Sequence, residues 1–292
     1  MTWSNNLFYI AFLSQILLLS YYFPNRLLER MQQVLTLYPP ETYPKLYPKP
    51  IEYYKMGQLT FKYVNRFVLL LGLAVLFAIM FWVDHSTFAD DGFISEAWPA
   101  AFGMIQYLPL LAVEISEFSN FKQMREANAA SRRTADLKRR SLGDVVSPAL
   151  IATALLLLAG AIIVDLFAHE FALNWENGSL GRAITLIVSN GVIASIGWWN
   201  LYGRKLDPHQ SSEDRYQRVS VTIKSLLYVS MAMSVFIAVT AIDDLYKLDY
   251  LDAVLMSVYF QAIALMSLGI PLNDLKLEEI DFDVYKNDPA TT

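Results

Sequence analysis

Residues 145–167 read VVSPALIATALLLLAGAIIVDLF and contain a single charged residue, Asp165. An α-helix rises 1.5 Å per residue, so a run of this length spans the roughly 30 Å hydrocarbon core of a bilayer. Inside lipid, a helix satisfies all its backbone hydrogen bonds within one segment, whereas an open strand or a loop does not. This stretch therefore predicts a transmembrane helix.

Six further apolar runs resemble it in length, and the weakest is 98–115, which Pro99, Gln106 and Pro109 interrupt. The chain is 55% apolar and 17% charged, and its charges gather between the runs, which favours a membrane bundle over one soluble domain. We expect an all-α transmembrane domain over residues 1–270 and an acidic tail over 271–292. The seven expected spans are 7–23, 64–83, 98–115, 145–167, 183–202, 221–242 and 253–270.

Lysine and arginine collect in every second connection. The segments between spans one and two, three and four, and five and six, with their helix ends, hold 19 of the 23 basic residues. Positively charged connections stay in the cytoplasm, so the N-terminus is expected outside and the C-terminus inside. Tryptophans fall at span ends and none falls in a span centre, which agrees with their preference for the headgroup region.

Three cytoplasmic segments carry further expectations. Residues 25–37 alternate apolar and polar side chains at helical spacing, which predicts a short amphipathic helix along the inner membrane surface. The proline- and tyrosine-rich residues 38–50 predict extended backbone, either packed on the bundle or offered to a proline-recognising partner. The acidic tail is expected to lie against the basic connections or to stay disordered.

Two carboxylates in the third span are candidates for an ion site. Gln106, Glu114 and Glu117 fall within about 80° of each other on one helix face, and ionisable groups inside a membrane are costly. They predict either a proton- or cation-handling site or, more simply, interhelical ion pairs near the inner headgroups. The expected ion-pair partners, which enter other spans at the same depth, are Lys62, Arg66 and Lys224.

Four carboxamides occupy the middles of the odd-numbered spans: Gln15, Gln106, Asn190 and Gln261. A carboxamide facing lipid is unfavourable, so all four are expected to point inward. They predict either interhelical hydrogen bonds, worth roughly 0.6–2 kcal/mol each, or a polar cavity for a small solute, a lipid headgroup or a quinone-like ligand.

A weak metal-site candidate lies at the outer end of the fourth span, where Asp165, His169 and Glu170 combine imidazole and carboxylate ligands. Ordinary polar residues at a span end explain the same pattern. The chain has no cysteine, which removes disulfides, thiolate metal sites and a cysteine nucleophile. No histidine lies deep in a span and no phosphate-binding loop occurs, so no cofactor is predicted.

The sequence leaves three classes of function open. We favour an accessory or scaffold subunit of a membrane complex, because no catalytic motif occurs. A small ion- or proton-coupled transporter or channel that uses Glu114, Glu117 and the amides is the alternative, and a lipid-active membrane enzyme is the third.

The expected environment is a bacterial inner membrane. Expected partners are the bilayer, anionic headgroups at the basic connections, and a membrane protein or a second copy of the chain. The net charge of -5 gives no indication of nucleic-acid binding.

Overall fold

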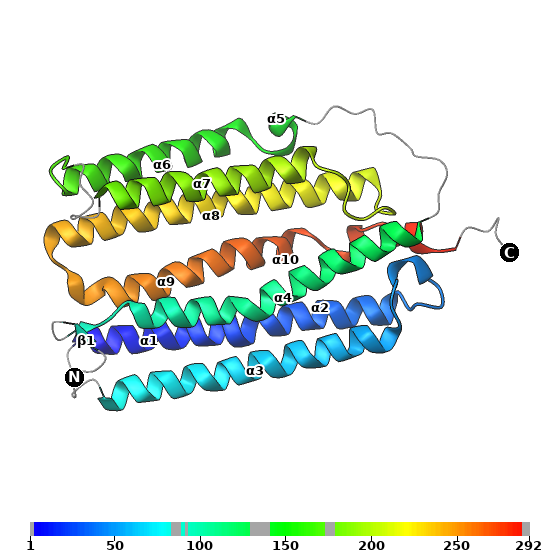
Figure 1. Cartoon of the computed structure of the whole chain (residues 1–292), viewed down its shortest axis with the longest axis horizontal. Coiled ribbons are helices and arrows are strands. Elements are labelled where there is room, and N and C mark those ends of the chain that lie inside the picture. Colours follow the sequence, from blue (N-terminus) through cyan, green and yellow to red (C-terminus); the bar gives the residue numbers. More distant parts are fainter. Residues whose placement is uncertain (1–2, 83–88, 91–92, 129–140, 173–178, 288–292) are drawn as a thin grey trace.

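The computed structural model describes residues 3–82, 89–90, 93–128, 141–172 and 179–287. In this part of the chain, seven long helical segments run alternately up and down a bundle (Figure 1), and each is long and apolar enough to cross a membrane. The integral membrane bundle predicted from the sequence is therefore present. The segments are Asn5–Leu37, Ile51–Phe81, Ala97–Ala127, Pro148–Ala168, Leu180–Tyr202, Ser212–Tyr246 and Asp249–Asp274.

The first segment is longer than the expected span 7–23. Helix α1 (Trp3–Leu17) passes through a five-residue π turn, η1 (Leu18–Tyr22), into α2 (Phe23–Leu37). The amphipathic residues 25–37 are thus helical, but they continue the first span along the bundle, as Figure 1 shows. Their placement on a membrane surface stays a prediction.

The next two helices also extend past the expected spans. Helix α3 covers Ile51–Trp82, and α4 covers Ala97–Ala127 without a break at Pro109. The extension of α4 past residue 115 follows from its good helix formers after the apolar run. A two-stranded antiparallel pair, β1 (Ala89–Asp90) and β2 (Phe93–Ile94), precedes α4.

The fourth span begins later than expected. A short helix, α5 (Leu142–Val145), ends before α6 (Pro148–Ala168), so the span starts at residue 148 rather than 145. The Ser147 hydroxyl accepts a hydrogen bond from the Leu150 amide at 3.3 Å, and Pro148 fills the first helical turn. Both features are typical of a helix start.

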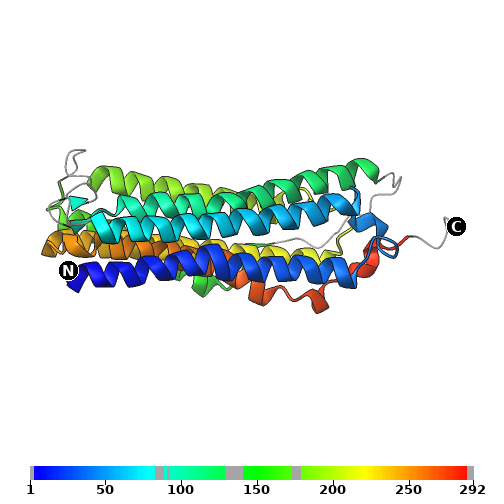
Figure 2. The ribbon, with the colours of Figure 1, turned by 90° about the horizontal axis from the view of Figure 1, so that it is seen from below.

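Helices α7 (Ser179–Tyr202) and α8 (Ser212–Tyr246) follow. The last span is α9 (Asp252–Ala264), a second π turn, η5 (Leu265–Gly269), and α10 (Ile270–Asp274). Short 3₁₀ turns cover Pro44–Leu46, Asp249–Leu251, Leu277–Glu279 and Phe282–Tyr285. Helix α1 begins at one end of the bundle and the tail leaves from the other (Figure 2), and we call these the N-terminal and C-terminal ends.

The helices form two groups. In the α1 group, α1 and α4 each pack on α3 and α9; in the α8 group, α6 and α7 pack on α8. The α1 group contains an aromatic core in which the Phe12 ring stacks on Phe8 at 5.3 Å and meets Phe102 edge-on at 5.7 Å. Helix α8 joins the groups through α9, where the Phe236 and Tyr259 rings stack at 4.2 Å.

The structure describes the tail as far as Asn287, and the tail residues Phe282 and Tyr285 are buried. Phe282 stacks on Tyr38 with ring centroids 3.7 Å apart, and the Tyr285 hydroxyl donates a hydrogen bond to Asp207. Burial and the Asp207 carboxylate raise the pKa of Tyr285 above its ordinary value. We call these four residues the tail contact. The described part of the tail is thus docked on the bundle, and its partners in this contact are Tyr38 and Asp207 rather than basic residues.

Candidate functional site

Two of the predicted amides meet between α1 and α4. The Gln15 side-chain nitrogen donates to Gln106 Oε1 at 3.0 Å and to the Pro99 carbonyl at 3.2 Å. Gln106 in turn donates to the Ser20 hydroxyl at 2.8 Å. Gln15, Gln106 and Ser20 are buried, with at most 3% of each residue exposed. The hydrogen-bond donors of Gln15 and Gln106 therefore connect the first helical segment to α4.

The same amide supports an irregular turn. Gln106 Nε2 also donates, at 3.4 Å, to the backbone carbonyl of Gln15, three residues before the π turn of the first segment. The second π turn has a similar support, because the Ser225 hydroxyl of α8 donates to the Met266 carbonyl at 2.5 Å. A π turn shifts the helical hydrogen-bond ladder, and side chains from neighbouring helices compensate.

The other two amides lie apart from each other. Gln261 of α9 donates to the Ala11 carbonyl at 3.0 Å and accepts from the Ser14 hydroxyl at 3.0 Å, so it too binds α1. Asn190 of α7 instead accepts a hydrogen bond from Ser230 of α8. Gln15 of α1, with Gln106 and Gln261 on the helices packed against it, forms contacts of α1. Asn190 lies in the α8 group, so the four amides do not line one common interior.

The three polar residues predicted on one face of the third span lie in different environments. Gln106 is buried against α1, Glu114 is exposed, and Glu117 forms an ion pair with Arg218 of α8 at 3.2 Å. An arc of 80° on a helix is wide enough to cross from a packed face to an open one. Within the described part of the chain, the expected partners Lys62, Arg66 and Lys224 make no ion pair within 4 Å with either carboxylate.

A charge cluster around the buried Asp165 closes the N-terminal end of the α8 group, and we call it the arginine clamp. Arg182 of α7 lies 3.1 Å from Asp165 of α6 (Nε to Oδ1) and 2.6 Å from Asp244 of α8 (Nη1 to Oδ2). The first contact is an ion pair by distance, although its angle lies outside hydrogen-bond geometry. His169 Nε2 lies 2.5 Å from Arg182 Nη2. One guanidinium thus joins three helix ends.

This cluster bears on the metal hypothesis for Asp165, His169 and Glu170. Asp165 and His169 surround the Arg182 guanidinium, while Glu170 is exposed at the surface. Among the described residues, no three histidine, aspartate or glutamate side chains are arranged to hold a metal ion. The positive charge beside Asp165 in the structure is therefore the Arg182 guanidinium.

An apolar groove of about 500 Å³ runs between α6, α7 and α8. We call it the α7 groove. Small residues at three-residue steps form its α7 side: Gly191, Ala194 and Gly197. The bonded pair Asn190 and Ser230 provides its polar groups. A Cβ atom added to Gly191 would meet no atom within 4 Å, so this glycine fits no neighbour inside the chain.

The groove follows the least covered helix of the bundle. In the most apolar 18-residue stretch of each segment, 56% is buried for Asn5–Leu37 but only 6% for Leu180–Tyr202. Helix α7 contacts α8 along one side and leaves large apolar side chains such as Ile187 and Trp198 exposed. Helix α7 thus carries a long surface that the described residues of this chain do not cover.

Sequence reasoning missed both Arg182 and the groove. A carboxylate inside a span, Asp165, needs a cation, and Arg182 is one of the few basic residues predicted on that side, so a signal existed for the clamp. The small-residue spacing of α7 was the available signal for the groove. The tail contact had none, because aromatic residues of a tail and a distant loop carry no shared pattern.

No protein-family model, no curated protein and no solved structure matches this chain. The comparisons therefore assign it to no family, and any function has to be argued from the geometry.

Proposed function

We propose that the chain is an accessory subunit of a membrane assembly and that its α7 groove receives a transmembrane helix of another membrane protein. The observation that carries the proposal is the open space at Gly191 on a helix that its own chain scarcely covers. Lipid tails are as apolar as leucine, so membrane helices associate by close packing at small residues rather than by a hydrophobic effect.

Glycines elsewhere in the chain indicate what this residue does here. A Cβ atom on Gly72 of α3 would lie 2.5 Å from the Phe102 ring, and one on Gly103 of α4 would lie 2.6 Å from the Phe260 ring. In the α1 group, glycine therefore admits a neighbouring helix. Gly191 has the same chemistry without a neighbour, and a partner helix would complete the arrangement.

The transport alternative has less support. It relied on amides and carboxylates around one polar interior, but Gln15 and Gln106 bind each other and Glu117 binds Arg218. Groups that satisfy one another between helices stabilise the bundle and offer few free ligands to a passing ion. For the third alternative, a lipid-active membrane enzyme, no observation on the described residues favours a particular nucleophile.

Cross-linking from the groove in native membranes tests the proposal. Leu155 lines the groove, whereas Leu156 is exposed on the same helix at the same depth and points elsewhere. We expect p-benzoylphenylalanine at position 155 to form one discrete, heavier cross-linked product with a different polypeptide, and position 156 to form none. Lipid adducts alone at both positions, or a product made of two copies of this chain, would contradict the proposal.

A further inference from the structure

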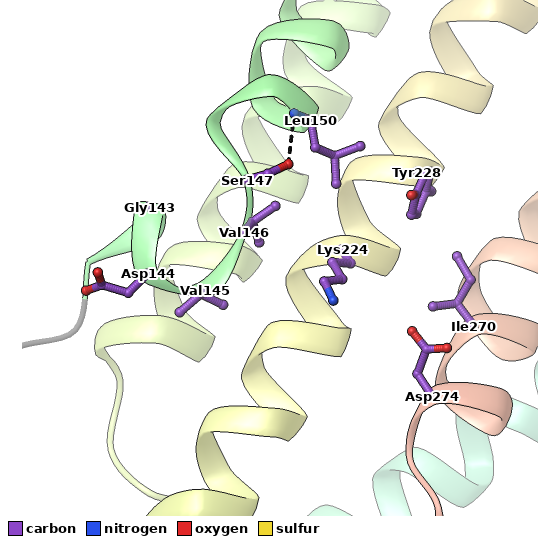
Figure 3. A pocket seen from close by; sticks show the side chains of 10 residues that line it. All are labelled: Gly143, Asp144, Val145, Val146, Ser147, Leu150, Lys224, Tyr228, Ile270 and Asp274. Carbon is purple, nitrogen blue, oxygen red and sulfur yellow. Dashed lines mark hydrogen bonds between the residues drawn. The ribbon is translucent and has the colours of Figure 1, made fainter.

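A second cavity, of about 680 Å³, shares no lining residue with the α7 groove. It is bounded by the extended link between α5 and α6, by α8 and by α10 (Figure 3). Lys224 of α8 and Asp274 of α10 place an amine and a carboxylate on facing walls, as Figure 3 shows. Leu150, Tyr228 and Ile270 form apolar and aromatic walls.

Three charged side chains line this cavity, and the Asp144 carboxylate already accepts hydrogen bonds from the amide and the hydroxyl of Ser141. The other two, Lys224 and Asp274, line the cavity without neutralising each other. Within the described residues, neither Lys224 nor Asp274 takes part in an ion pair within 4 Å. Lys224 follows the start of the apolar run of α8, and Asp274 ends α10 at the C-terminal end of the bundle. A lysine at such a position reaches for the headgroup region while its stem stays among apolar side chains.

We infer that this cavity binds a zwitterion that carries a phosphate and a primary ammonium group, as a phosphoethanolamine headgroup does. The phosphate would face Lys224 and the ammonium group would donate hydrogen bonds to Asp274, so Lys224 and Asp274 each gain a partner. An anionic headgroup satisfies Lys224 but is repelled by Asp274. A quaternary ammonium group has no N–H donor for the carboxylate.

The source of this chemistry is either a membrane lipid or a free solute. A cavity of this volume is in the range of small-molecule sites, and its apolar walls suit the glycerol and first methylene groups of a lipid. The inference does not depend on a partner helix in the α7 groove, because the two spaces have no lining residue in common.

Native mass spectrometry of the full chain, released from nanodiscs with equal amounts of phosphatidylethanolamine, phosphatidylglycerol and phosphatidylcholine of matched acyl chains, tests this inference. We expect phosphatidylethanolamine to be retained at least about fivefold over either competitor, the effect of roughly one favourable charge pair. Lys224→Met should abolish this retention, and Asp274→Asn should shift it toward phosphatidylglycerol. Matched controls are Lys62→Met and Glu126→Gln, whose charges lie outside the cavity.

Glycerophosphoethanolamine, added in excess, distinguishes the two sources. Displacement of the lipid shows that the headgroup alone is recognised, whereas no displacement shows that the acyl-linked lipid is the ligand; both outcomes support the zwitterion site. Equal retention of the three lipids by the unmodified chain, or a Lys224 or Asp274 variant that behaves as the controls do, would overturn it.

Discussion

The α1 group and the α8 group are built from the same kind of apolar helix, yet the helices of the α1 group are packed more closely at their glycines. In the α1 group, rings fill the space over Gly72 and Gly103, and Gln15 and Gln106 bind each other across the interface. In the α8 group, Gly191 and Gly160 face open space. The contrast appears in burial as well, with 56% of the first segment's apolar stretch covered and 6% of α7.

This difference indicates which part of the molecule is complete by itself. Membrane helices are held by close packing and interhelical hydrogen bonds, and the α1 group has both. The α8 group has the arginine clamp at one end and the Asn190–Ser230 hydrogen bond between α7 and α8, beside the open α7 groove. A surface left open in a bundle that otherwise packs tightly is where we place the contact with a partner.

Removal of the clamp should produce the largest effect. Arg182→Leu leaves the buried Asp165 carboxylate without its cation, which should cost roughly 3–5 kcal/mol of unfolding free energy. Reversible denaturation in mixed micelles measures the loss, and amide hydrogen exchange should rise in α6 and α7 before it rises in α1. The double variant Asp165→Leu/Arg182→Leu should regain most of the stability; a double variant no more stable than Arg182→Leu would show that the clamp is not the cause.

Overpacking the two groups should give opposite results. Gly103→Leu drives a side chain into the Phe260 ring, which would lie 2.6 Å from the new Cβ atom, and should destabilise the chain by about 1–3 kcal/mol. Gly160→Leu is the matched control, because a Cβ atom there meets nothing within 4 Å. Its unfolding free energy should change by less than about 0.5 kcal/mol. Equal losses from both variants would mean that the α8 group is as tightly packed as the α1 group.

Removal of an amide should likewise cost more unfolding free energy in the α1 group than in the α8 group. Gln106→Leu removes a partner of both Gln15 and Ser20 and should cost about 1–2 kcal/mol. Asn190→Leu removes one bond between helices, from Ser230, and one within α7, to the Leu186 carbonyl. The Ser230 hydroxyl is able to turn to a carbonyl of its own helix, so the cost should stay below about 1 kcal/mol. The same denaturation experiment ranks them, and a reversed order would show that Asn190 has a role beyond packing.

The tail contact should give the smallest change. Tyr285→Phe removes the hydrogen bond to Asp207 and should weaken docking by about 0.5–1.5 kcal/mol. A spin label on Asn287→Cys, the only cysteine of that variant, reports the effect as higher mobility. Tyr246→Phe at the other end of the bundle is the control, and equal mobility in both variants would exclude a contribution from the hydroxyl.

The same label tests the pH dependence of docking. Because the docked tyrosine has a raised pKa, its contribution to docking is complete below pH 10.0, its ordinary value. Above that pH the phenol of the undocked tail ionises while the docked one stays protonated, so docking should weaken as pH rises. Tyr285→Phe should lack this additional loss, and the same alkaline change in both chains would contradict the assignment to Tyr285.

Apolar run length was enough to predict seven membrane helices, because each run is long and has few charges. Some of their ends were harder to predict: α3 begins at Ile51, before the expected residue 64, and α6 begins only after the cap at Ser147. Sequence could indicate that a mid-span amide needs a partner. It could not indicate that Gln106 meets Gln15 while Asn190 meets Ser230, because the register of helices distant in sequence decides which side chains face each other.

The most direct measurement of the central claim is the composition of membrane patches that an amphipathic polymer excises around the tagged chain. The account predicts that patches with the unmodified chain or with Gly160→Leu contain a second, different membrane polypeptide in fixed proportion. Patches with Gly191→Leu, whose Cβ atom would meet none of the described residues within 4 Å, should contain the folded chain without that polypeptide. Patches in which the unmodified chain is alone, or in which Gly191→Leu retains the same polypeptide, would contradict the account.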